Sequence, residues 1–370
     1  MDSALLMDPG FWLDDRPWVP AAAVGEVPRF PELGGVVWFA TSGSSGPPKW
    51  LALSKPGLLI SAAAVNAHLG VTEDSCWGLA LPLHHVGGFG VVARAFEAGC
   101  ELRRFSPRWQ PAEFANWLGA EAITHTSLVP TQVHDLVAAA LEAPPALKAI
   151  VVGGGQLDQA TGRAARLLGW PVLASFGMTE AGSQIATQTL EELEQPYQPA
   201  PLPVLPIWQT AVAEDGQLRI AGPALFLGTF TQSDCGWHYQ PRVGEWHSCS
   251  DRVALANGKL TPLGRLDAVV KVLGELVDPA AIEQELLALG QGKLAIGSLA
   301  VATIADERSG HRLVPVVETS VPAIIIAEVL AAYHRQAPGF RRLQAVVWVD
   351  SLPRSPLGKI RRQELTGMVG

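Results

Sequence analysis

Short apolar runs alternate with segments of helical period up to about residue 180 of the 370-residue chain. Each run ends at a polar or glycine-rich stretch, which is typical of a buried strand that leads into a loop. The predicted strands are 36–40, 77–81, 123–126, 149–152 and 172–175, and the predicted helices are 57–69, 89–97, 132–141 and 159–168. Strands that alternate with helices predict parallel α/β layers. Because ligands bind beyond the carboxyl ends of such strands, the glycine-rich stretches there are candidate nucleotide sites.

The pattern changes after about residue 200. Short alternating runs such as 217–220 and 259–263, separated by turn residues, predict a small β-rich section. From Val269 onward the chain follows an α+β pattern, with predicted helices 280–289 and 323–335 and predicted strands 299–304, 314–317 and 345–349. We therefore expect an α/β multidomain fold. Its large N-terminal domain (1–266) has α/β layers and the β-rich section, and its small, mobile C-terminal domain (267–370) is α+β. Residues 1–35, rich in Trp and Pro, are expected to wrap the surface.

Composition narrows the class of protein. Hydrophobic residues make up 48% of the chain and charged residues 17%, which is typical of a well-buried globular protein. The formal net charge is −8 and no dense Lys/Arg run occurs, which argues against a nucleic-acid partner. The four cysteines form no CxxC pair, so the usual zinc and redox motifs are excluded and a reducing cytoplasm is expected.

The sequence gives no sign of export or membrane insertion. Its first residues lack a basic stretch followed by an apolar core, and no apolar run reaches the roughly 20 residues that cross a bilayer. We expect a cytoplasmic protein, and the sequence leaves a homodimer open.

The loop between residues 41 and 49 carries the clearest chemistry. It combines hydroxyls, glycines and a terminal lysine, so that backbone N–H groups and a cation can surround phosphate oxygens. Its candidate phosphate-binding residues are Thr41, Ser42, Gly43, Ser44, Ser45, Gly46 and Lys49. The loop is not the GxxxxGK[ST] motif of ordinary P-loop NTPases, since Pro48 precedes Lys49 and Trp50 follows it. A flexible Gly/Ser-rich surface loop is the alternative.

The order of residues in this loop resembles the phosphate-binding signature of the adenylate-forming enzymes, the family of acyl-CoA synthetases, luciferases and peptide-synthetase adenylation domains. Further segments resemble later signatures of that family in the same order; they are 175–180, 250–251, 264–267 and 355–361. The resemblance covers nearly the whole chain. It implies an enzyme that uses ATP and Mg²⁺ to activate a carboxylic acid as an acyl-adenylate and then transfers the acyl group to CoA.

The resemblance assigns roles around the nucleotide. Thr179 and Glu180 contact phosphate, and the Glu180 carboxylate holds Mg²⁺, a hard cation that prefers oxygen ligands. Alternatively, Glu180 only begins a helix, where acidic residues are favoured. Asp251 accepts hydrogen bonds from the ribose hydroxyls, assisted by Arg265. The alternative is a surface ion pair between Asp251 and Arg252.

Three consecutive glycines follow the predicted strand 149–152 and form the expected adenine site. They are Gly153, Gly154 and Gly155. Because glycine has no side chain, a base can lie directly against this backbone. A tight strand-to-helix turn is the alternative.

Lys359 is the main catalytic candidate. In the family, the matching lysine reaches into the active site from a loop near the C-terminus. There it stabilises the charge that develops as the carboxylate attacks the α-phosphate. Without the resemblance, Lys359 would be read as a solvated tail lysine. Asp267 matches the family's hinge, at which the C-terminal domain rotates between the adenylating and the thioester-forming arrangement.

Three segments limit which carboxylic acid is expected as the substrate. Residues 81–88, 124–132 and 244–247 resemble the o-succinylbenzoate–CoA ligases of menaquinone and phylloquinone synthesis. The implied substrate is an aromatic acid with two carboxylates. Its candidate contacts are His85, Arg94, Ser127, Ser175, Phe176 and Gly177.

Arg94 supports a diacid independently of the resemblance. It lies in the otherwise apolar helical stretch 89–96, and a buried arginine needs an anionic partner. One carboxylate of o-succinylbenzoate reacts, so a planar guanidinium suits the other. We expect Arg94 to hold it, with His85 lining the aromatic pocket. The alternative is an ion pair of Arg94 with Glu97 on one helix face.

Two departures from the family bear on the outer pocket and on the acceptor. Only 40 residues precede the phosphate loop, fewer than in most relatives. Leu273 stands where relatives usually have the first of two glycines, in a loop that borders the pantetheine channel. A carrier-protein thiol is therefore kept as an alternative acceptor to CoA. A non-catalytic nucleotide-binding protein is the alternative of a different class.

Overall fold

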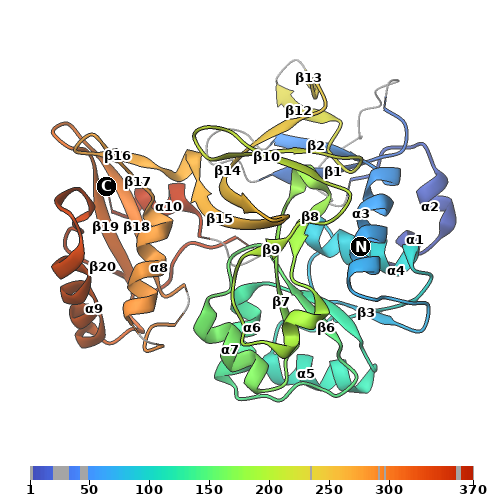
Figure 1. The fold of residues 1–370 in the computed structure, drawn as a ribbon, viewed down its shortest axis with the longest axis horizontal. Helices are drawn as coiled ribbons and strands as arrows, with labels where there is room; N and C mark the ends of the chain where they lie inside the picture. Colours follow the sequence, from blue (N-terminus) through green and yellow to red (C-terminus); the bar gives the residue numbers. More distant parts are fainter. Residues whose placement is uncertain are drawn as a thin grey trace. The chain divides into compact units, whose positions relative to one another are not determined.

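The computed structural model describes residues 3–19, 33–41, 49–233, 236–290, 292–295, 297–355 and 360–369, without the side chains of Thr41, Lys49, Gln232, Ser233 and Asp267. The chain divides into two compact units, and the fold has the predicted α/β multidomain class (Figure 1). The N-terminal unit comprises Met1–Ala213, Arg219–Ser248 and Ala254–Thr261, and the C-terminal unit comprises Glu214–Leu218, Cys249–Val253 and Pro262–Gly370. A domain boundary between 266 and 267 stays a prediction.

A six-stranded sheet lies at the centre of the N-terminal unit, in the order β4-β3-β5-β6-β7-β8. Its strands are β3 (Cys76–Leu79), β4 (Glu101–Arg104), β5 (His125–Leu128), β6 (Ala149–Val152), β7 (Val172–Met178) and β8 (Ser183–Thr187). The pairs from β4 to β7 are parallel, as predicted, and β8 joins antiparallel. The apolar pattern does not predict β4, because three of its four residues are exposed.

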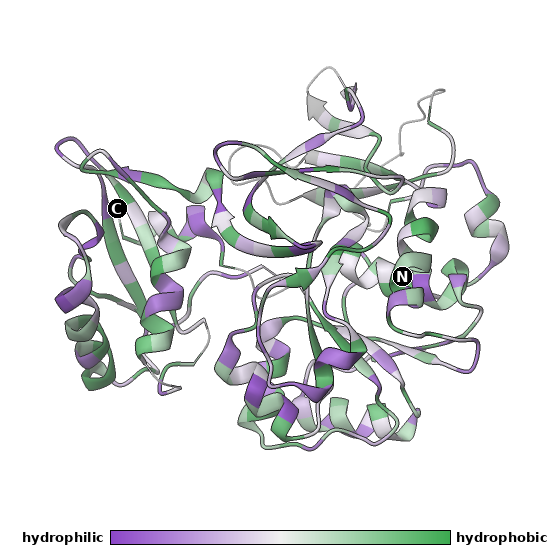
Figure 2. Ribbon diagram, in the orientation of Figure 1, coloured by the Kyte–Doolittle hydropathy of each residue, from purple (hydrophilic) through white to green (hydrophobic). Residues whose placement is uncertain are grey.

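One helix precedes the first strand of this sheet, and four more connect its strands. They are α3 (Lys55–His68), α4 (Val86–Glu97), α5 (Pro111–Ala120), α6 (Pro130–Ala138) and α7 (Gln159–Leu167). α5 has no counterpart among the predicted helices, although it begins at Pro111, a residue suited to a first helical turn. Purple and green segments alternate along α7 in Figure 2, as in an amphipathic helix. None of the described helices combines the length and apolar character that a membrane crossing requires.

The strand predicted at 36–40 exists, but it belongs to an antiparallel sheet and not to the parallel layer. β1 (Val36–Thr41) pairs with β2 (Lys49–Ser54), with Thr41 opposite Lys49. β12 (Gly228–Ser233) and β13 (Gly236–Pro241) complete the order β1-β2-β12-β13. The rings of Trp38 and Phe230 stack with centroids 3.8 Å apart, which joins the two hairpins. This pairing depends on residues far apart in the chain, so local apolar runs cannot reveal it.

The N-terminal segment contributes to the core as well as covering it. α1 (Ser3–Leu6) and α2 (Pro9–Leu13) bury Phe11 and Trp12. The buried Lys55 side chain donates hydrogen bonds to the carbonyls of Phe11 and Asp14, at 2.7 and 2.6 Å. Burial lowers the pKa of Lys55. These backbone acceptors therefore anchor the segment through one cation of α3.

The predicted β-rich section is a five-stranded sheet in the order β10-β11-β14-β15-β9. Its strands are β9 (Leu202–Pro203), β10 (Gln209–Val212), β11 (Gln217–Ala221), β14 (His247–Ala256) and β15 (Lys259–Arg265). Both predicted runs, 217–220 and 259–263, lie in strands.

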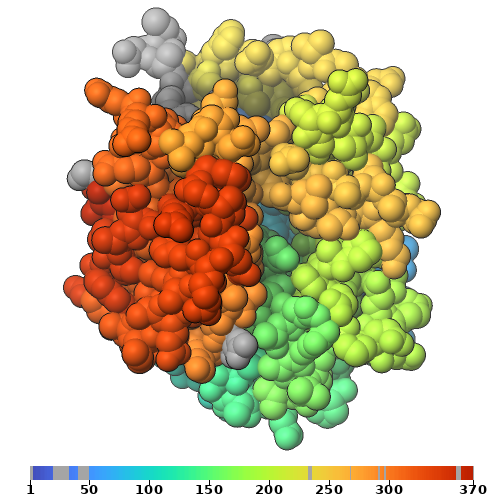
Figure 3. Space-filling view, turned by 60° about the vertical axis from the view of Figure 1, so that its left-hand side comes forward, coloured from blue at the N-terminus to red at the C-terminus, as the bar shows by residue number. Residues whose placement is uncertain are grey.

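The C-terminal unit has the predicted α+β character. It contains β16 (Val270–Val272), β17 (Glu275–Val277), α8 (Pro279–Leu289), β18 (Leu299–Asp306), β19 (Gly310–Glu318), α9 (Ala323–Gln336), β20 (Val347–Val349) and α10 (Arg362–Gly367). β18, β19 and β20 form one sheet, and buried side chains such as Ile282, Val317 and Tyr333 form its core. The part of this unit from β16 onward forms an orange-to-red surface in Figure 3.

Candidate active site

The carboxyl ends of the parallel strands bring two of the predicted segments to one edge of the sheet. Leu128 and Val152 end β5 and β6 and are register partners, and Ala174 pairs with Val152 inside β7, which continues to Met178. The glycines 153–155 follow β6, and the signature 175–180 begins within β7. This is the place where ligands bind in parallel α/β sheets.

The phosphate loop is described only at its two ends. Ser42, Gly43, Ser44, Ser45 and Gly46 lie outside the described residues, as do the side chains of Thr41 and Lys49. The backbones of Thr41 and Lys49 are register partners in β1 and β2. The predicted loop therefore joins neighbouring strands of a hairpin.

Two of the three predicted adenine-site glycines occupy positions that a side chain would disturb. Gly154 has φ +79°, a conformation that favours glycine. A Cβ on Gly153 would lie 3.1 Å from the Ser175 hydroxyl, which donates to the Val152 carbonyl at 2.9 Å. The strand-to-turn alternative is compatible with this geometry, and the adenine role stays a prediction.

The signature 175–180 is shaped by close contact between β7 and β8. A Cβ on Gly177 would collide with the carbonyl of Ser183, and the β7–β8 register shifts between Phe176 and Gly177. Thr179 and Glu180 lie in a short 3₁₀ turn, η1 (Thr179–Ala181), directly after β7. Glu180 is thus in a first helical turn, as the alternative supposed, and its partly buried side chain stands at the strand end.

Arg94 is buried in α4 and is 2% exposed. Its Nη1 donates to Ser127 Oγ at 3.3 Å and its Nη2 donates to Ser183 Oγ at 3.4 Å. The guanidinium also lies over the Trp77 ring, 5.3 Å from the ring centroid. Burial lowers the pKa of Arg94 to about 10, so the group stays charged at neutral pH.

The alternative of an ion pair between Arg94 and Glu97 is wrong. Oε2 of Glu97 accepts a hydrogen bond from Asn66 Nδ2 at 2.7 Å instead. Among the described residues no carboxylate forms a salt bridge with Arg94, and burial is the only influence on its pKa. The site therefore holds a cation whose partners in the described part of the chain are all neutral.

Ser183 and Trp77 are contacts of Arg94 that sequence reasoning missed. Ser183 has φ 129°, which is unusual for a residue with a side chain. Its neighbour in space, Gly90, leaves room for the guanidinium, since a Cβ there would lie 3.2 Å from Nη2 of Arg94. The position of Ser183 just after the signature 175–180 is the one signal in the sequence that points to it.

His85 lies immediately before α4 and is partly buried. Its ring centroid lies 4.2 Å from that of His84. Gly88 allows α4 to begin beside this loop, because a Cβ there would collide with the Pro82 carbonyl. His85 and Arg94 thus lie at opposite ends of the same helix, and a shared role in the acid pocket stays a prediction.

The two predicted ribose residues lie together in the C-terminal unit. Asp251 on β14 and Arg265 on β15 form an ion pair at 3.7 Å. Arg252 instead donates to the Asp215 carbonyl at 3.2 Å, so the alternative of an Asp251–Arg252 pair is wrong. A ribose hydroxyl that bonds to Asp251 would therefore bind beside Arg265 or displace it.

The hinge and the catalytic lysine are only partly described. Lys359 lies outside the described residues. Asp267 is in the 3₁₀ turn η3 (Leu266–Ala268), and its side chain lies outside the description. Gly264 has φ +109°, and a Cβ there would collide with the Asp278 carboxylate. The positive φ therefore favours glycine at this position of the signature, and a side chain there would also displace the Asp278 carboxylate.

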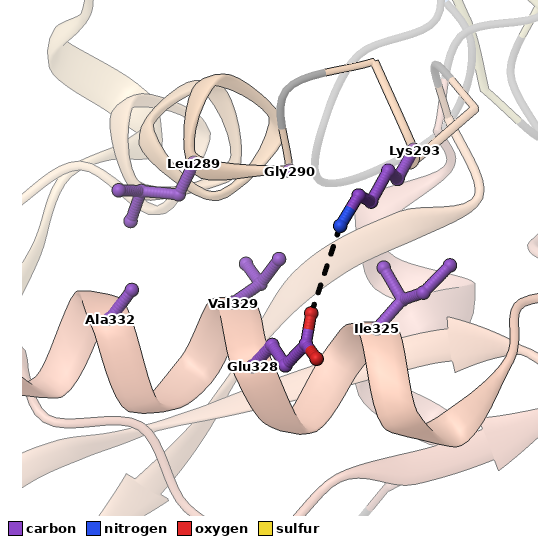
Figure 4. A pocket seen from close by; sticks show the side chains of 7 residues that line it. All are labelled: Leu289, Gly290, Lys293, Ile325, Glu328, Val329 and Ala332. Carbon is purple, nitrogen blue, oxygen red and sulfur yellow. Dashed lines mark ion pairs between the residues drawn. The ribbon is translucent and has the colours of Figure 1, made fainter.

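A hollow of about 210 Å³ lies elsewhere, between α8 and α9 of the C-terminal unit (Figure 4). Leu289, Ile325, Val329 and Ala332 form its apolar lining. Lys293 and Glu328 face each other at its rim, 3.9 Å apart and both largely exposed. None of the predicted site residues lines it.

Known proteins with similar sequences include AMP-binding enzymes, the family that the signature segments resemble. The family model of the AMP-binding enzymes matches residues 35–228. The 2-succinylbenzoate–CoA ligase of Geobacillus kaustophilus is 27% identical over 347 residues, which cover 89% of this chain and 68% of that protein. The 2-succinylbenzoate–CoA ligase of Escherichia coli is 28% identical over 293 residues, 78% of this chain and 59% of that protein.

Solved structures show the same fold. The o-succinylbenzoate CoA synthetase of Bacillus subtilis, in complex with its acyl-adenylate intermediate, has a TM-score of 0.75 at 23% identity and covers 89% of this chain and 68% of its own. ATP-bound MatB from Rhodopseudomonas palustris has a TM-score of 0.73 at 23% identity, with 90% of this chain and 67% of its own covered. Since the matched family model spans more than half of its residues, this chain belongs to the AMP-binding enzyme family.

Proposed function

We propose that the protein is an AMP-forming acid–CoA ligase whose acid is o-succinylbenzoate, in the synthesis of menaquinone or phylloquinone. The observation that supports the diacid most is Arg94, a buried cation with only neutral partners in the described residues. A buried charge without a counterion is costly, so a bound carboxylate would be strongly favoured there. The similarity to ligases named for this acid supports the same assignment.

The first half-reaction forms the acyl-adenylate. A carboxylate oxygen of the acid attacks the α-phosphorus of ATP, an O–P bond forms, and the bond to the bridging oxygen breaks as pyrophosphate leaves. Lys359 stabilises the charge that grows on the α-phosphate. Thr179 and the loop from Thr41 to Lys49 hold the phosphates, while the glycines 153–155 support the adenine.

Glu180 suits a magnesium ion that accompanies ATP. The described residues contain no cluster of three or more His, Cys, Asp or Glu side chains that could hold a metal by themselves. Mg²⁺ is commonly held by one or two carboxylates together with substrate phosphates, and a single carboxylate at the strand end fits that pattern. When bound, the ion would offset phosphate charge.

The second half-reaction transfers the acyl group to a thiol. The sulfur attacks the acyl carbon, a thioester forms and AMP leaves. We propose that the division into 1–266 and 267–370, with Asp267 as hinge, serves these two steps. Asp251 and Arg265 would hold the ribose of the nucleotide throughout.

We also propose a cytoplasmic location, supported by three free buried cysteines, Cys76, Cys100 and Cys249. The partners are the acid, ATP and CoA, with a homodimer left open and no role for nucleic acid or membrane insertion.

A carrier-protein thiol is the second candidate acceptor. Leu273 and Leu276 on the β16–β17 hairpin are 59% and 68% exposed, and such apolar side chains favour contact with a partner. A panel of acids tested for pyrophosphate release, with and without CoA, separates the candidates. We expect o-succinylbenzoate to be preferred and a CoA thioester to form. Acid-dependent pyrophosphate release without any CoA thioester would favour the carrier protein, and no release with any acid would indicate a non-catalytic protein.

A further inference from the structure

Ser183, the first residue of β8, has a backbone conformation that a residue with a side chain rarely adopts. Its φ is 129°, well outside the left-handed helical region, which covers roughly +50° to +70°. The other described residues with a side chain and a positive φ stay close to that region, between 47° and 53°; they are Ala122, Ala140, Asn257 and Leu273. Glycine adopts the φ of Ser183 without strain, so the serine side chain is present at a cost in free energy. Strain of this kind is concentrated at functional sites, where the surrounding structure maintains it.

Strand β7 holds the backbone of Ser183 in place. The chain turns back through η1 and Gly182, whose N–H donates to the Thr179 carbonyl at 3.1 Å. The Ser183 carbonyl then lies against Gly177, where an added Cβ would collide with it. Met178 and Ser183 are register partners at this end of the β7–β8 pair. The contact between the two strands therefore imposes the conformation of Ser183, and the direction of its side chain follows from that conformation.

The Ser183 side chain meets α4 at Gly90. A Cβ on Gly90 would lie 3.6 Å from both the Cβ and the Oγ of Ser183, and 3.2 Å from Nη2 of Arg94. Ser183 Oγ accepts a hydrogen bond from that Nη2 at 3.4 Å. Gly90 is therefore a notch in the helix surface in which the hydroxyl and the guanidinium meet.

Two neutral hydroxyls orient the Arg94 guanidinium. Ser127 Oγ on β5 accepts from Nη1 at 3.3 Å, so each terminal nitrogen has one partner. The Trp77 ring supports the face of the group, which lies 5.3 Å from the ring centroid. A guanidinium has five N–H donors, and these two bonds are its hydrogen bonds within the described part of the chain. The remaining donors are oriented but are left for an anionic ligand.

We propose that Ser183 is a positioning residue for the acid substrate, because its strained backbone aims a hydroxyl at Arg94 and fixes the guanidinium before the second carboxylate binds. The inference rests on the proposed role of Arg94. Preorganisation raises affinity because the ordering of the group is not left to the binding step. A neutral hydroxyl suits this task, since a carboxylate at the same position would itself pair with the cation. The serine thus orients Arg94 without neutralising it.

The test separates the hydroxyl of Ser183 from its backbone strain. Ser183→Ala removes the hydroxyl and keeps the strain, whereas Ser183→Gly removes both. For both variants we expect the KM for o-succinylbenzoate to rise about 10-fold, as for the loss of a hydrogen bond to a charged group, while kcat and the KM for ATP stay unchanged. An analogue whose non-reacting carboxylate is a methyl ester should be used as well by the variants as by the wild type. Steady-state pyrophosphate release measures each constant.

Thermal unfolding tests the strain separately. Ser183→Gly should raise the unfolding midpoint by about 2 °C, because the relief of the positive φ outweighs the added freedom of the unfolded chain. Ser183→Ala should not raise it. Ala140→Gly is the matched control, since Ala140 also has a positive φ but lies exposed just after α6 and not beside Arg94. This control should keep the wild-type KM for the acid.

The outcomes distinguish the two proposals. If Arg94→Met lowers the use of diacid and ester equally, the proposed role of Arg94 fails, and the inference about Ser183 fails with it. If Arg94→Met affects only the diacid while both Ser183 variants keep the wild-type KM, positioning by Ser183 is refuted and the role of Arg94 stands. In an Arg94→Met background, Ser183→Gly should cost nothing further, since Ser183 acts through Arg94. An additional loss in the double variant, or a lower unfolding midpoint for Ser183→Gly, contradicts positioning by a strained residue.

Discussion

Arg94 of the N-terminal unit is buried and Arg362 of the C-terminal unit is partly exposed, and the two arginines have opposite surroundings. Arg94 touches two serine hydroxyls and a tryptophan ring, and burial lowers its pKa. Arg362 is matched by a carboxylate through two hydrogen bonds, and its pKa is raised. A cation that the fold leaves without a counterion is available to a ligand, whereas a matched cation serves the scaffold.

The two arginines differ because only Arg362 has an acidic side chain that pairs with it. Glu97, three residues from Arg94, accepts a hydrogen bond from Asn66 of α3 and forms no ion pair with the guanidinium. Glu283 has Val301 and Arg362 as partners that both require its carboxylate. Each outcome depends on contacts between elements, and not on the spacing of charges along one helix.

The largest effect is expected from removing the unmatched cation. Arg94→Met should lower kcat/KM for o-succinylbenzoate roughly 150-fold, because a desolvated charge pair with the substrate is lost. This corresponds to a loss of about 3 kcal/mol of transition-state stabilisation. An analogue in which the non-reacting carboxylate is a methyl ester should be used about equally by wild type and variant. Steady-state pyrophosphate release measures both. If Arg94→Met lowers kcat/KM equally for the diacid and the ester, Arg94 does not act as the counterion of the second carboxylate.

A buried histidine, His125, tests whether burial can keep a basic side chain uncharged. His125 on β5 is fully buried, and burial lowers its pKa to about 4. The unfolded chain binds this proton near its ordinary pKa of about 6.5, so the contribution of His125 is complete above that pH and is lost as pH falls towards 4. We expect the free energy of unfolding to fall by up to about 3 kcal/mol over this window.

Urea unfolding across this pH range measures the effect of His125. His125→Gln is the control, because it has no titrating group and should flatten the dependence. An unchanged slope in that variant would assign the acid sensitivity to other groups.

Stability should respond with opposite signs at the two arginines. Arg362→Met leaves Glu283 without its cation and should lower the free energy of unfolding by about 2 kcal/mol, less than for a fully buried pair because Arg362 is 37% exposed. Arg94→Met removes an unmatched buried charge and should raise it by about 1 kcal/mol. Thermal and urea unfolding of both variants provide the comparison. Destabilisation by both changes would mean that Arg94 is a structural residue.

The smallest effect is expected at a strained residue of the C-terminal unit. Leu273 has φ +53° and is exposed, so its side chain loses little contact when removed. Leu273→Gly should raise the free energy of unfolding by about 1 kcal/mol because glycine adopts positive φ without strain. Leu276→Gly, in the strand of the same hairpin, is the control and should be destabilising. A loss of stability in Leu273→Gly would show that the leucine makes a contact that compensates for its conformation.

Much of the fold was predictable because it depends on local pattern. The runs that became β6 and the start of β7 are apolar, short and separated by helical segments, which is typical of strands buried on both faces of a covered parallel sheet. β4 and the pairing of β1 with β2 were not predicted, and each has a physical reason. β4 is an exposed edge strand with charged residues, and β1 finds partners through pairing that the order of residues does not encode locally.

The sequence by itself determined the signature segments, the parallel α/β layer and the candidate residues for phosphate, adenine and acid. It could do so because these depend on residue type and on short spacing. Only the tertiary structure decided which charges are matched. Asp251 lies with Arg265 and not Arg252, Arg94 lies with serines and not Glu97, and Arg362 lies with Glu283. Charge pairing inside a protein depends on distance and burial, which follow from contacts between residues far apart in the chain.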